Sequence, residues 1–417
     1  MRTSNIRFIH VGLKLLALIA LAACSFTGCS SGTAGSESEL VKLEKGLRQA
    51  AKLTDRRELK VQTRSRGHTE EGKTTSPRPL TPRAPKQPVR AIYVSSHVAN
   101  GSRLKELVRL LDETELNAMV LDVNSGIALT SPGRQKGKES EIVPIPSDKR
   151  PARHFREVVK ELKKQRVYLI ARIVTFKNPE LAKAVPSWAL KRKNGKIWTD
   201  RNGTPWIDPY QQKSWGYPIA LAEYAAKLGF DEVQFDYVRF PENASKVDEE
   251  VSYANPQGRT KDEAIQAFLH RARARLRPAG VLVSADVFGM VGSSEDDMGI
   301  GQKWNKIVRE VDVVSPMIYP SHYSGGIWGI RHPDLTPGPI IRHALEDATK
   351  KNRKLNGQGI ATAKVRPWLQ GFTAGWVDPH QKYGQAQIRE QVLAAKRSGI
   401  TSYMLWNSSC RYPEFTI

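Results

Sequence analysis

The 417-residue chain has little cysteine and lacks several of the short motifs that mark metal and hydrolase sites. It contains three Cys with no CxxC pair, which argues against structural zinc and against a disulfide framework. The nine His show no ligand spacing, and neither an HExxH zinc motif nor a GxSxG elbow occurs. Beyond the N-terminus no apolar run reaches 18 residues, so a multi-span membrane protein is excluded. We therefore expect a protein that needs no metal and no cofactor.

Acidic residues are also scarce, because 65 Lys and Arg face 42 Asp and Glu, for a formal charge of +23. Residues 1–23 carry +3, residues 24–88 carry +6, and the remaining 329 residues carry +14. A charge spread so evenly indicates a basic surface and no nucleic-acid footprint. Such a surface favours acidic polymers or an anionic membrane, and solubility alone is the simpler alternative.

The N-terminal segment has the pattern of a bacterial lipoprotein signal. Arg2 and Arg7 precede the apolar stretch 11–23, which ends in Leu-Ala-Ala before Cys24. The pattern predicts cleavage after residue 23 and acylation of Cys24, so the protein is exported and held at a membrane by lipid. The alternatives are acylation of Cys29, or an ordinary secretory signal. We expect a lipid-anchored envelope protein, at the outer membrane or the cell surface.

Residues 24–88 have the composition of a tether. Small residues cluster at 30–38, and Pro recurs almost every third position at 77–88, which favours stiff, extended polyproline II. The stretch 39–60 between them has apolar residues at helical spacing but is too polar to span a membrane. We interpret 24–88 as a linker and 89–417 as the folded domain.

From residue 89 onward, short apolar runs alternate with helical segments, which predicts parallel strands. Helix-to-strand turns are tight, whereas the connections that leave the strands are long. Eight repeats in 329 residues favour a closed α/β (β/α)8 (TIM) barrel, and an open doubly wound sheet is the alternative. No glycine-rich phosphate fingerprint follows the first strand. The predicted strands are 91–95, 118–123, 167–174, 232–237, 281–287, 312–319, 368–372 and 402–406.

Alternation of side chains along these strands selects a set of inward-facing polar residues. If Val233 and Phe235 face the helices, then Gln234 and Asp236 point inward, with Asp236 at the C-terminal rim. The same parity places Asp286, Asp122 and Arg172 at that rim. Barrel enzymes keep their active sites there. Simple salt bridges, such as Asp122–Arg172 or Arg239–Asp286, are the structural alternative.

Three of these strands carry longer motifs. The segment from Gly229 to Pro241, GFDEVQFDYVRFP, resembles the hallmark of a bacterial family called putative glycosyl hydrolase domain (domain of unknown function 4015). Residues 284–289 and 315–323 are similar to its next two strand motifs, and the resemblance runs from about 89 to 407. It implies a glycosidase-type barrel of bacterial envelopes. One departure is Asn178, which stands where that pattern leads us to expect Asp.

Glycoside hydrolysis also fits the residues themselves, since one carboxyl must protonate the leaving oxygen while a second attacks or activates water. We predict Asp236 as nucleophile or base and Asp286 as acid, with Asp122 as a further catalytic residue that orients substrate or tunes a pKa. The predicted substrate-binding residues are Arg172, Gln234, Arg239, Tyr319, His322 and Trp406. Arg172 and Arg239 would also keep a neighbouring carboxylate ionised.

Tryptophan supports a carbohydrate partner, because all nine lie beyond residue 187 and an indole can stack on a pyranose face. Ordinary packing of Trp beneath long loops is the alternative. We expect a polysaccharide or oligosaccharide as substrate and a monomeric protein. A barrel that only binds envelope glycan, or a structural scaffold, would share much of this pattern. The Trp predicted in rim loops are Trp188, Trp198, Trp206, Trp215, Trp328 and Trp376.

Overall fold

The computed structural model describes residues 85–126, 130–135, 138–145 and 150–414. The predicted signal peptide, Cys24, Cys29 and almost all of the predicted linker lie outside the described residues. The first strand begins at Arg90, close to the expected start of the folded domain.

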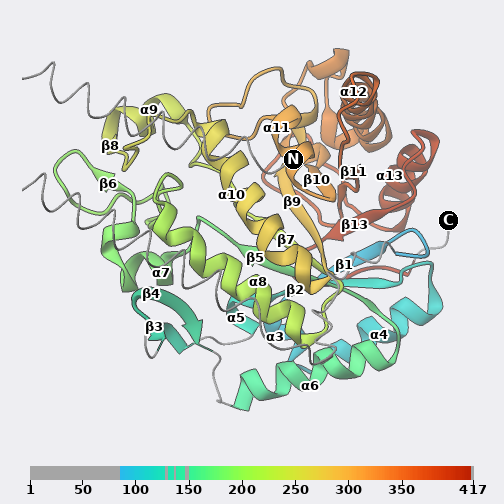
Figure 1. The fold of residues 1–417 in the computed structure, drawn as a ribbon. Helices are drawn as coiled ribbons and strands as arrows, with labels where there is room; N and C mark the ends of the chain where they lie inside the picture. Colours follow the sequence, from blue (N-terminus) through green and yellow to red (C-terminus); the bar gives the residue numbers. More distant parts are fainter. Residues whose placement is uncertain (1–84, 127–129, 136–137, 146–149, 415–417) are drawn as a thin grey trace, which may run out of the picture. The chain divides into compact units, whose positions relative to one another are not determined.

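Within the described residues, eight parallel strands close into a barrel, which confirms the α/β (β/α)8 prediction (Figure 1). Closure is made where β13 pairs with β1, so the open doubly wound sheet is wrong. A short strand, β11 (Lys364–Val365), pairs with β10 just before β12 does. The eight barrel strands are β1 (Arg90–Val94), β2 (Ala118–Asp122), β5 (Tyr168–Val174), β7 (Glu232–Asp236), β9 (Leu282–Phe288), β10 (Val313–Ile318), β12 (Trp368–Gln370) and β13 (Tyr403–Trp406).

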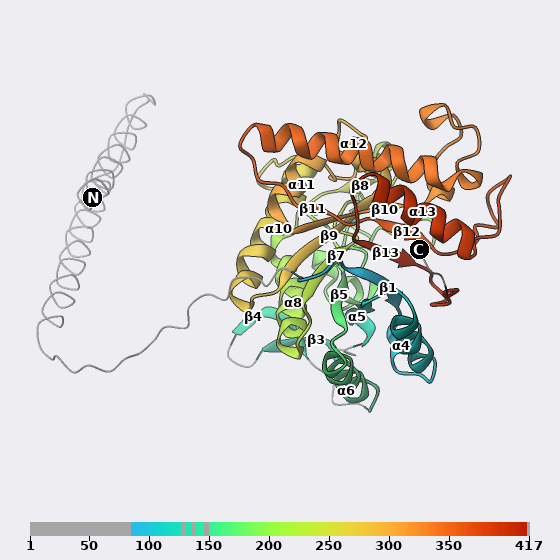
Figure 2. The same cartoon turned by 90° about the vertical axis from the view of Figure 1, so that its right-hand side faces the viewer.

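Helices surround this barrel. Figure 2 shows α12 and α13 together on one side, with α4 and α6 on the other. The longer helices are α4 (Leu104–Glu113), α6 (Arg150–Lys164), α8 (Gly216–Leu228), α10 (Lys261–Leu276), α11 (Trp304–Glu310), α12 (Pro337–Gly357) and α13 (Gln385–Arg397). Short helices also occur in the connections: α3 (Ser96–Ala99), α5 (Val123–Gly126), α7 (Pro179–Ala184) and α9 (Ala244–Glu250).

Helix α12 is absent from the sequence-based interpretation, which made 351–365 a surface loop. That prediction is wrong for 351–357, because the helix runs on to Gly357. Pro337 occupies the first turn, where its missing N–H costs nothing. Buried Ile340, Ile341 and Ala344 then form the apolar face, whereas the second half is rich in Lys and Asn. The loop-like composition of that second half concealed the helix.

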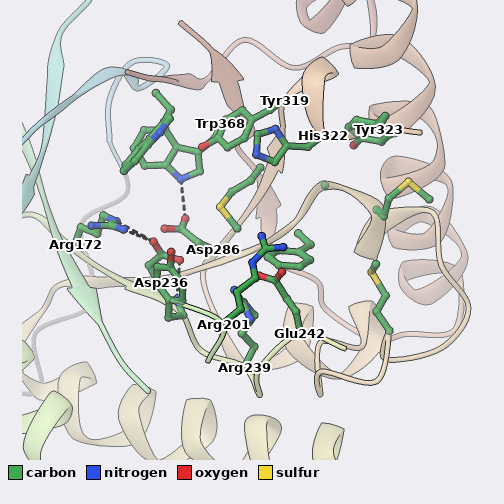
Figure 3. A pocket seen from close by; sticks show the side chains of 17 residues that line it. Arg172, Arg201, Asp236, Arg239, Glu242, Asp286, Tyr319, His322, Tyr323 and Trp368 are labelled. Atoms are coloured by element: carbon green, nitrogen blue, oxygen red, sulfur yellow. Dashed lines mark hydrogen bonds and ion pairs between the residues drawn. The ribbon is translucent and has the colours of Figure 1, made fainter. Parts of the chain in front are cut away.

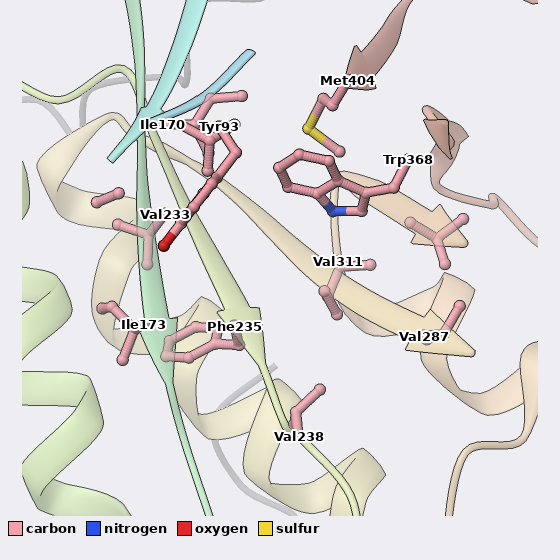
Figure 4. Close-up of a cluster of buried hydrophobic side chains, with 14 of the residues drawn as sticks. Tyr93, Ile170, Ile173, Val233, Phe235, Val238, Val287, Val311, Trp368 and Met404 are labelled. Atoms are coloured by element: carbon pink, nitrogen blue, oxygen red, sulfur yellow. The ribbon is translucent and has the colours of Figure 1, made fainter. Parts of the chain in front are cut away.

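The core lies between the strands and the helices. Phe235 packs edge-on against Phe268 of α10, with ring centroids 5.2 Å apart, so its outward orientation is confirmed. Ile173 is the register partner of Phe235 on β5, and the two side chains lie side by side in Figure 4. Because these residues face the helices, the alternate residues Gln234 and Asp236 face the barrel axis.

Tight entry into β7 fixes the height of that strand. Helix α8 ends at Gly229, whose φ of 99° is a left-handed conformation that glycine adopts without strain. The N–H of Asp231 then bonds the carbonyl of Leu169, and the strand proper begins one residue later. The short loop therefore sets which residue of β7 reaches the rim.

The connections that follow β5 and β7 meet above the barrel. Two short strands, β6 (Lys191–Arg192) and β8 (Val251–Ser252), pair antiparallel and tie the two connections together. A second hairpin, β3 (Thr130–Gln135) with β4 (Lys138–Ile145), follows β2. In the part of the chain that the structure describes, no helix has the length and apolarity of a membrane span.

Candidate active site

A cavity of about 540 Å³ opens at the C-terminal ends of the strands (Figure 3). Seven of the residues predicted from the sequence to act in catalysis or substrate binding line it: Arg172, Asp236, Arg239, Asp286, Tyr319, His322 and Trp406. They come from β5, β7, β9 and β13 and from the segments that follow β7 and β10. The converging strands and their loops therefore bring together most of the predicted set.

Arg172 connects two of the predicted carboxylates. Its Nε donates to Oδ2 of Asp236 over 2.9 Å, and its Nη1 pairs with Asp122, which is level with it on β2. The ring of Trp406 lies 5.1 Å from the guanidinium carbon. Burial alone would lower the pKa of Arg172, but the charges of Asp236 and Asp122 raise it well above its usual value. The guanidinium is therefore a permanent cation that holds Asp236 in place.

Asp236 is the last residue of β7 and is buried, with 6 % of its surface exposed. Oδ1 accepts the backbone N–H of Tyr237 over 2.6 Å, while Oδ2 accepts from Arg172. Tyr237 itself has a φ of 50°, a left-handed conformation that is unusual for a bulky residue. This sharp turn aims the Tyr237 N–H back at the carboxylate, so both carboxylate oxygens are oriented.

Asp286 stands level with Asp236, because Phe235 pairs with Ala285 in the register of β7 and β9. Its Oδ1 accepts from Nε1 of Trp368 over 2.8 Å. No cation among the described residues lies within salt-bridge distance of it. Burial and then the charge of Asp236 raise the pKa of Asp286 well above its usual value. The two carboxyls facing this cavity thus have different environments: Asp236 is bound by a cation, and Asp286 is not.

Tyr319 and His322 lie on the opposite wall from Asp236. Burial, and then the charges of Asp286 and Asp236, raise the pKa of Tyr319, so its hydroxyl remains a donor. Burial lowers the pKa of His322, so its ring is neutral at neutral pH. Both side chains can therefore exchange hydrogen bonds with sugar hydroxyls without adding charge.

Three predicted residues have positions that differ from the expectation. Gln234 does not line the cavity; it lies deeper in the barrel, where its Nε2 donates to Ser315 Oγ over 3.2 Å. Its predicted contact with substrate is therefore wrong. Asp122 is also absent from the cavity wall and contacts Arg172 from behind. Arg239 pairs with Glu242 over 3.0 Å and not with Asp286, so the Arg239–Asp286 bridge is wrong.

Most of the predicted rim Trp are packing residues. Trp188, Trp198, Trp206 and Trp215 are buried, and the indole N–H of the last three bonds Glu250, Asp200 and the carbonyl of Pro209. Trp376 differs, because 70 % of its surface is exposed. It stacks on Phe372 with an interplanar angle of 17° and meets the ring of His322 at 6.5 Å. Of the six, Trp376 alone presents an open face.

Several cavity residues were not predicted from the sequence. Trp368 was left open as possible core, and Arg201 and Glu242 sit in loops where strand parity gives no signal. The unusual Asn178 caps α7, its Oδ1 accepting the N–H of Leu181 over 3.0 Å. Because Asn and Asp are equally good N-caps, the departure from the expected Asp leaves this local structure intact. Among the described residues, no group of three or more His, Cys, Asp or Glu is arranged to hold a metal ion.

A closed parallel barrel with two unlike carboxyls at its C-terminal rim is the architecture of many glycosidases. The family model described as "Putative glycosyl hydrolase domain" matches residues 91–412. The chain belongs to this family, and the resemblance noted in its strand motifs is confirmed.

Solved structures share the fold. The glycoside hydrolase domain of PgaB (BpsB) from Bordetella bronchiseptica is 15 % identical, with a TM-score of 0.50 over 78 % of this chain and 95 % of that one. A beta-galactosidase from the psychrophilic Marinomonas ef1 is 14 % identical, with a TM-score of 0.52 over 79 % of this chain and 56 % of that one. A hypothetical protein from Ruminiclostridium thermocellum is 31 % identical and covers 50 % of this chain and 98 % of its own, with a TM-score of 0.38. A comparison with curated proteins gave no match.

Proposed function

We propose that the barrel hydrolyses glycosidic bonds of an envelope or extracellular polysaccharide, with Asp236 and Asp286 as the catalytic pair. The observation that carries this proposal is the contrast between the two carboxyls. Both face one cavity at the same height, yet Arg172 binds Asp236 while Asp286 has its pKa raised by burial. Glycosidases need such a division between an anionic group and a protonated acid.

The residues divide the chemistry as follows. Asp286 gives its proton to the leaving glycosidic oxygen as the C–O bond breaks. Asp236 either attacks the anomeric carbon or takes a proton from the attacking water. Arg172 and the N–H of Tyr237 hold the Asp236 carboxylate throughout. Asp122 supports this arrangement through Arg172 and is a positioning residue.

Tyr319, His322 and Trp406 are proposed to bind the sugar. Tyr319 and His322 supply neutral hydrogen-bonding groups on one wall, and Trp406 adds an aromatic surface beside Arg172. Polar groups on one side and an aromatic face on the other are suited to a pyranose, which has hydroxyls at its edge and C–H groups on its faces.

A panel of bacterial polysaccharides tests this function, with the wild type and Asp236→Asn assayed side by side for new reducing ends. We expect the wild type to release them from at least one polymer and the variant to release none. Saturable binding without turnover by the wild type would instead establish the alternative, a non-catalytic glycan-binding protein on the same barrel.

We also propose that a lipid at Cys24 holds the protein to a bacterial membrane. The support is the Leu-Ala-Ala-Cys pattern after a short apolar stretch. Labelling with radioactive palmitate followed by fractionation tests it. Cys24→Ser should lose the label and leave the membrane fraction, whereas Cys29→Ser should keep both. Label that persists in Cys24→Ser would contradict the assignment.

A further inference from the structure

A second cavity of about 340 Å³ adjoins the first. Arg201 and Glu242 line both of them, so the two cavities meet at these side chains. Figure 3 shows Arg201 and Glu242 together, on the side of the first cavity away from Trp368. A sugar chain that leaves the first cavity on this side enters the second. This inference rests on the proposed glycan substrate and concerns the chemical class of that glycan.

The acidic groups of the second cavity are already neutralised. Asp200 pairs with Lys177 over 3.1 Å, and Glu250 pairs with Arg192 over 2.7 Å. Glu242 pairs with Arg239, which belongs to the first cavity. Each carboxylate therefore has its own cation at salt-bridge distance.

Two cations are left over. Among the described residues, no carboxylate lies within salt-bridge distance of Arg201 or Lys246, although Lys246 acts electrostatically on Glu250 from farther away. Both side chains are exposed and line the second cavity. This cavity thus has an excess of positive charge that no described group of the protein balances.

Arg201 is presented by a fixed turn. The Asp200 carboxylate accepts the N–H of Asn202 over 2.9 Å and the N–H of Thr204 over 3.0 Å. The N–H of Asp200 also bonds the carbonyl of Thr204, which closes the turn. A guanidinium on an ordered turn loses less conformational freedom when it binds an anion than one on a loose loop would.

Stacking has little part in this second cavity. Trp198 and Trp206 line it, but only 5 % and 2 % of their surfaces are exposed, and both indole N–H groups are already bonded. Recognition here must come mainly from charge and from hydrogen bonds, for which Asn202 and Asn243 are also at hand. An Arg–carboxylate contact is the strong interaction that such a site can make.

We propose that the second cavity binds a negatively charged group on the glycan, so that the substrate is an acidic polysaccharide. The anion is carried by a sugar next to the cleaved bond, on the side of Arg201. A uronate carboxylate and a sulfate or phosphate ester share the chemistry that Arg201 and Lys246 recognise.

Binding by the full chain carrying Asp236→Asn tests this without interference from turnover. The ligands are hexamers of galacturonate, glucuronate and mannuronate, the neutral hexamers of the same linkages, and sulfated forms of the neutral ones. Isothermal titration at 50 and 200 mM NaCl gives the dissociation constants. We expect one acidic hexamer to bind at least about tenfold more tightly than its neutral counterpart, and less tightly at the higher salt. The uronate and sulfate arms show which anion is preferred.

The charge is then removed from the cavity. Adding Arg201→Gln should weaken the acidic ligand about tenfold, and adding Lys246→Gln as well should weaken it further. The matched control is the pair Arg353→Gln and Lys354→Gln on the exposed face of α12, which removes the same charge and should change nothing.

Two outcomes would overturn the acidic-substrate inference. One is that no acidic hexamer binds better than its neutral counterpart. The other is that the control pair weakens binding as much as the cavity pair does. Because binding is measured without catalysis, the inference stands or fails independently of whether the wild type hydrolyses a glycan.

Discussion

Strand β7 carries two acidic side chains into the barrel, one at each end, and they have opposite surroundings. Glu232 lies at the bottom, with none of its surface exposed. Both of its oxygens accept from Arg366, over 3.2 and 2.9 Å, and the hydroxyl of Tyr168 donates to it over 3.0 Å. One anion thus meets one buried cation, and the group is closed to substrate.

At the top of the same strand the charges do not balance. Asp236 shares Arg172 with Asp122, and Asp286 stands beside them with no cation at salt-bridge distance among the described residues. Asp236 and Asp286 both line the cavity. Burial alone therefore does not mark a functional acid, since Glu232 is the more deeply buried. Excess negative charge together with access from the cavity distinguishes the site from the scaffold.

The largest effect is expected from Asp236→Asn. Loss of the nucleophile or base should lower kcat by about 10⁴-fold or more, as for other catalytic groups that act as a unit. The melting temperature should stay equal or rise, because Arg172 keeps Asp122 and one repelling charge is removed. Hydrolysis kinetics and a thermal melt on the same sample measure both. A variant that melts lower and keeps its activity would reverse the roles assigned to the two ends of β7.

Glu232→Gln is the matched change at the bottom. It leaves Arg366 buried without a full charge partner, which should cost about 3–5 kcal/mol of unfolding free energy. The folded fraction should keep nearly all of its activity, because Glu232 does not line the cavity. Urea unfolding gives the free energy. As a control, Glu346→Gln breaks the exposed pair with Arg342 and should cost only about 0.3–0.5 kcal/mol.

Asp286 should give the enzyme its pH dependence. A raised pKa keeps the acid protonated to a higher pH, so the alkaline limb of kcat/KM should lie above the ordinary range of an aspartic acid. Asp286→Asn should cripple natural substrates but spare aryl glycosides, whose leaving group needs little protonation. With aryl glycosides the variant should lose the alkaline limb. A limb that persists would transfer the acid role to Glu242, the other carboxylate on the cavity wall.

The same shift has a signature in stability. The folded pKa of Asp286 is above its unfolded value of about 3.9, so the folded state holds more protons than the unfolded state between these two pH values. Stability should therefore fall as the pH rises through this interval. Asp286→Asn removes that part of the slope, and denaturant unfolding at a series of pH values should show the difference.

The comparison along β7 also shows what the sequence could and could not predict. Strand alternation selected Asp236 and Asp286 correctly, because the period of two is a property of every strand. The same alternation places Glu232 inside the barrel and cannot separate it from Asp236. The distinction depends on Arg366, which lies 134 residues further along the chain. Only the closed barrel brings these partners together.

Residues in loops were beyond the reach of periodicity. Arg201 and Glu242 reach the cavity because the connections after β5 and β7 are tied together by β6 and β8, a long-range pairing with no local signal. The Trp residues show the converse error. A cluster of Trp in predicted rim loops was taken as a sugar platform, but four of the six are buried in the folds of those loops.

Trp376 is the exception, and it tests the smallest effect. Its exposed ring adjoins His322 on the cavity wall, so a long glycan leaving the cavity on that side can stack on it. Trp376→Ala should raise KM for a polysaccharide about two- to tenfold, the equivalent of about 0.5–1.5 kcal/mol, with kcat unchanged. Aryl monosaccharides are too short to reach it and should be unaffected. Trp376→Tyr, which keeps an aromatic face, should restore most of the affinity, and Leu335→Ala, at another exposed apolar side chain, should have no effect. An equal rise in KM for short and long substrates would instead show that Trp376 acts by packing on Phe372 and His322, and would place it with the four buried Trp as part of the scaffold.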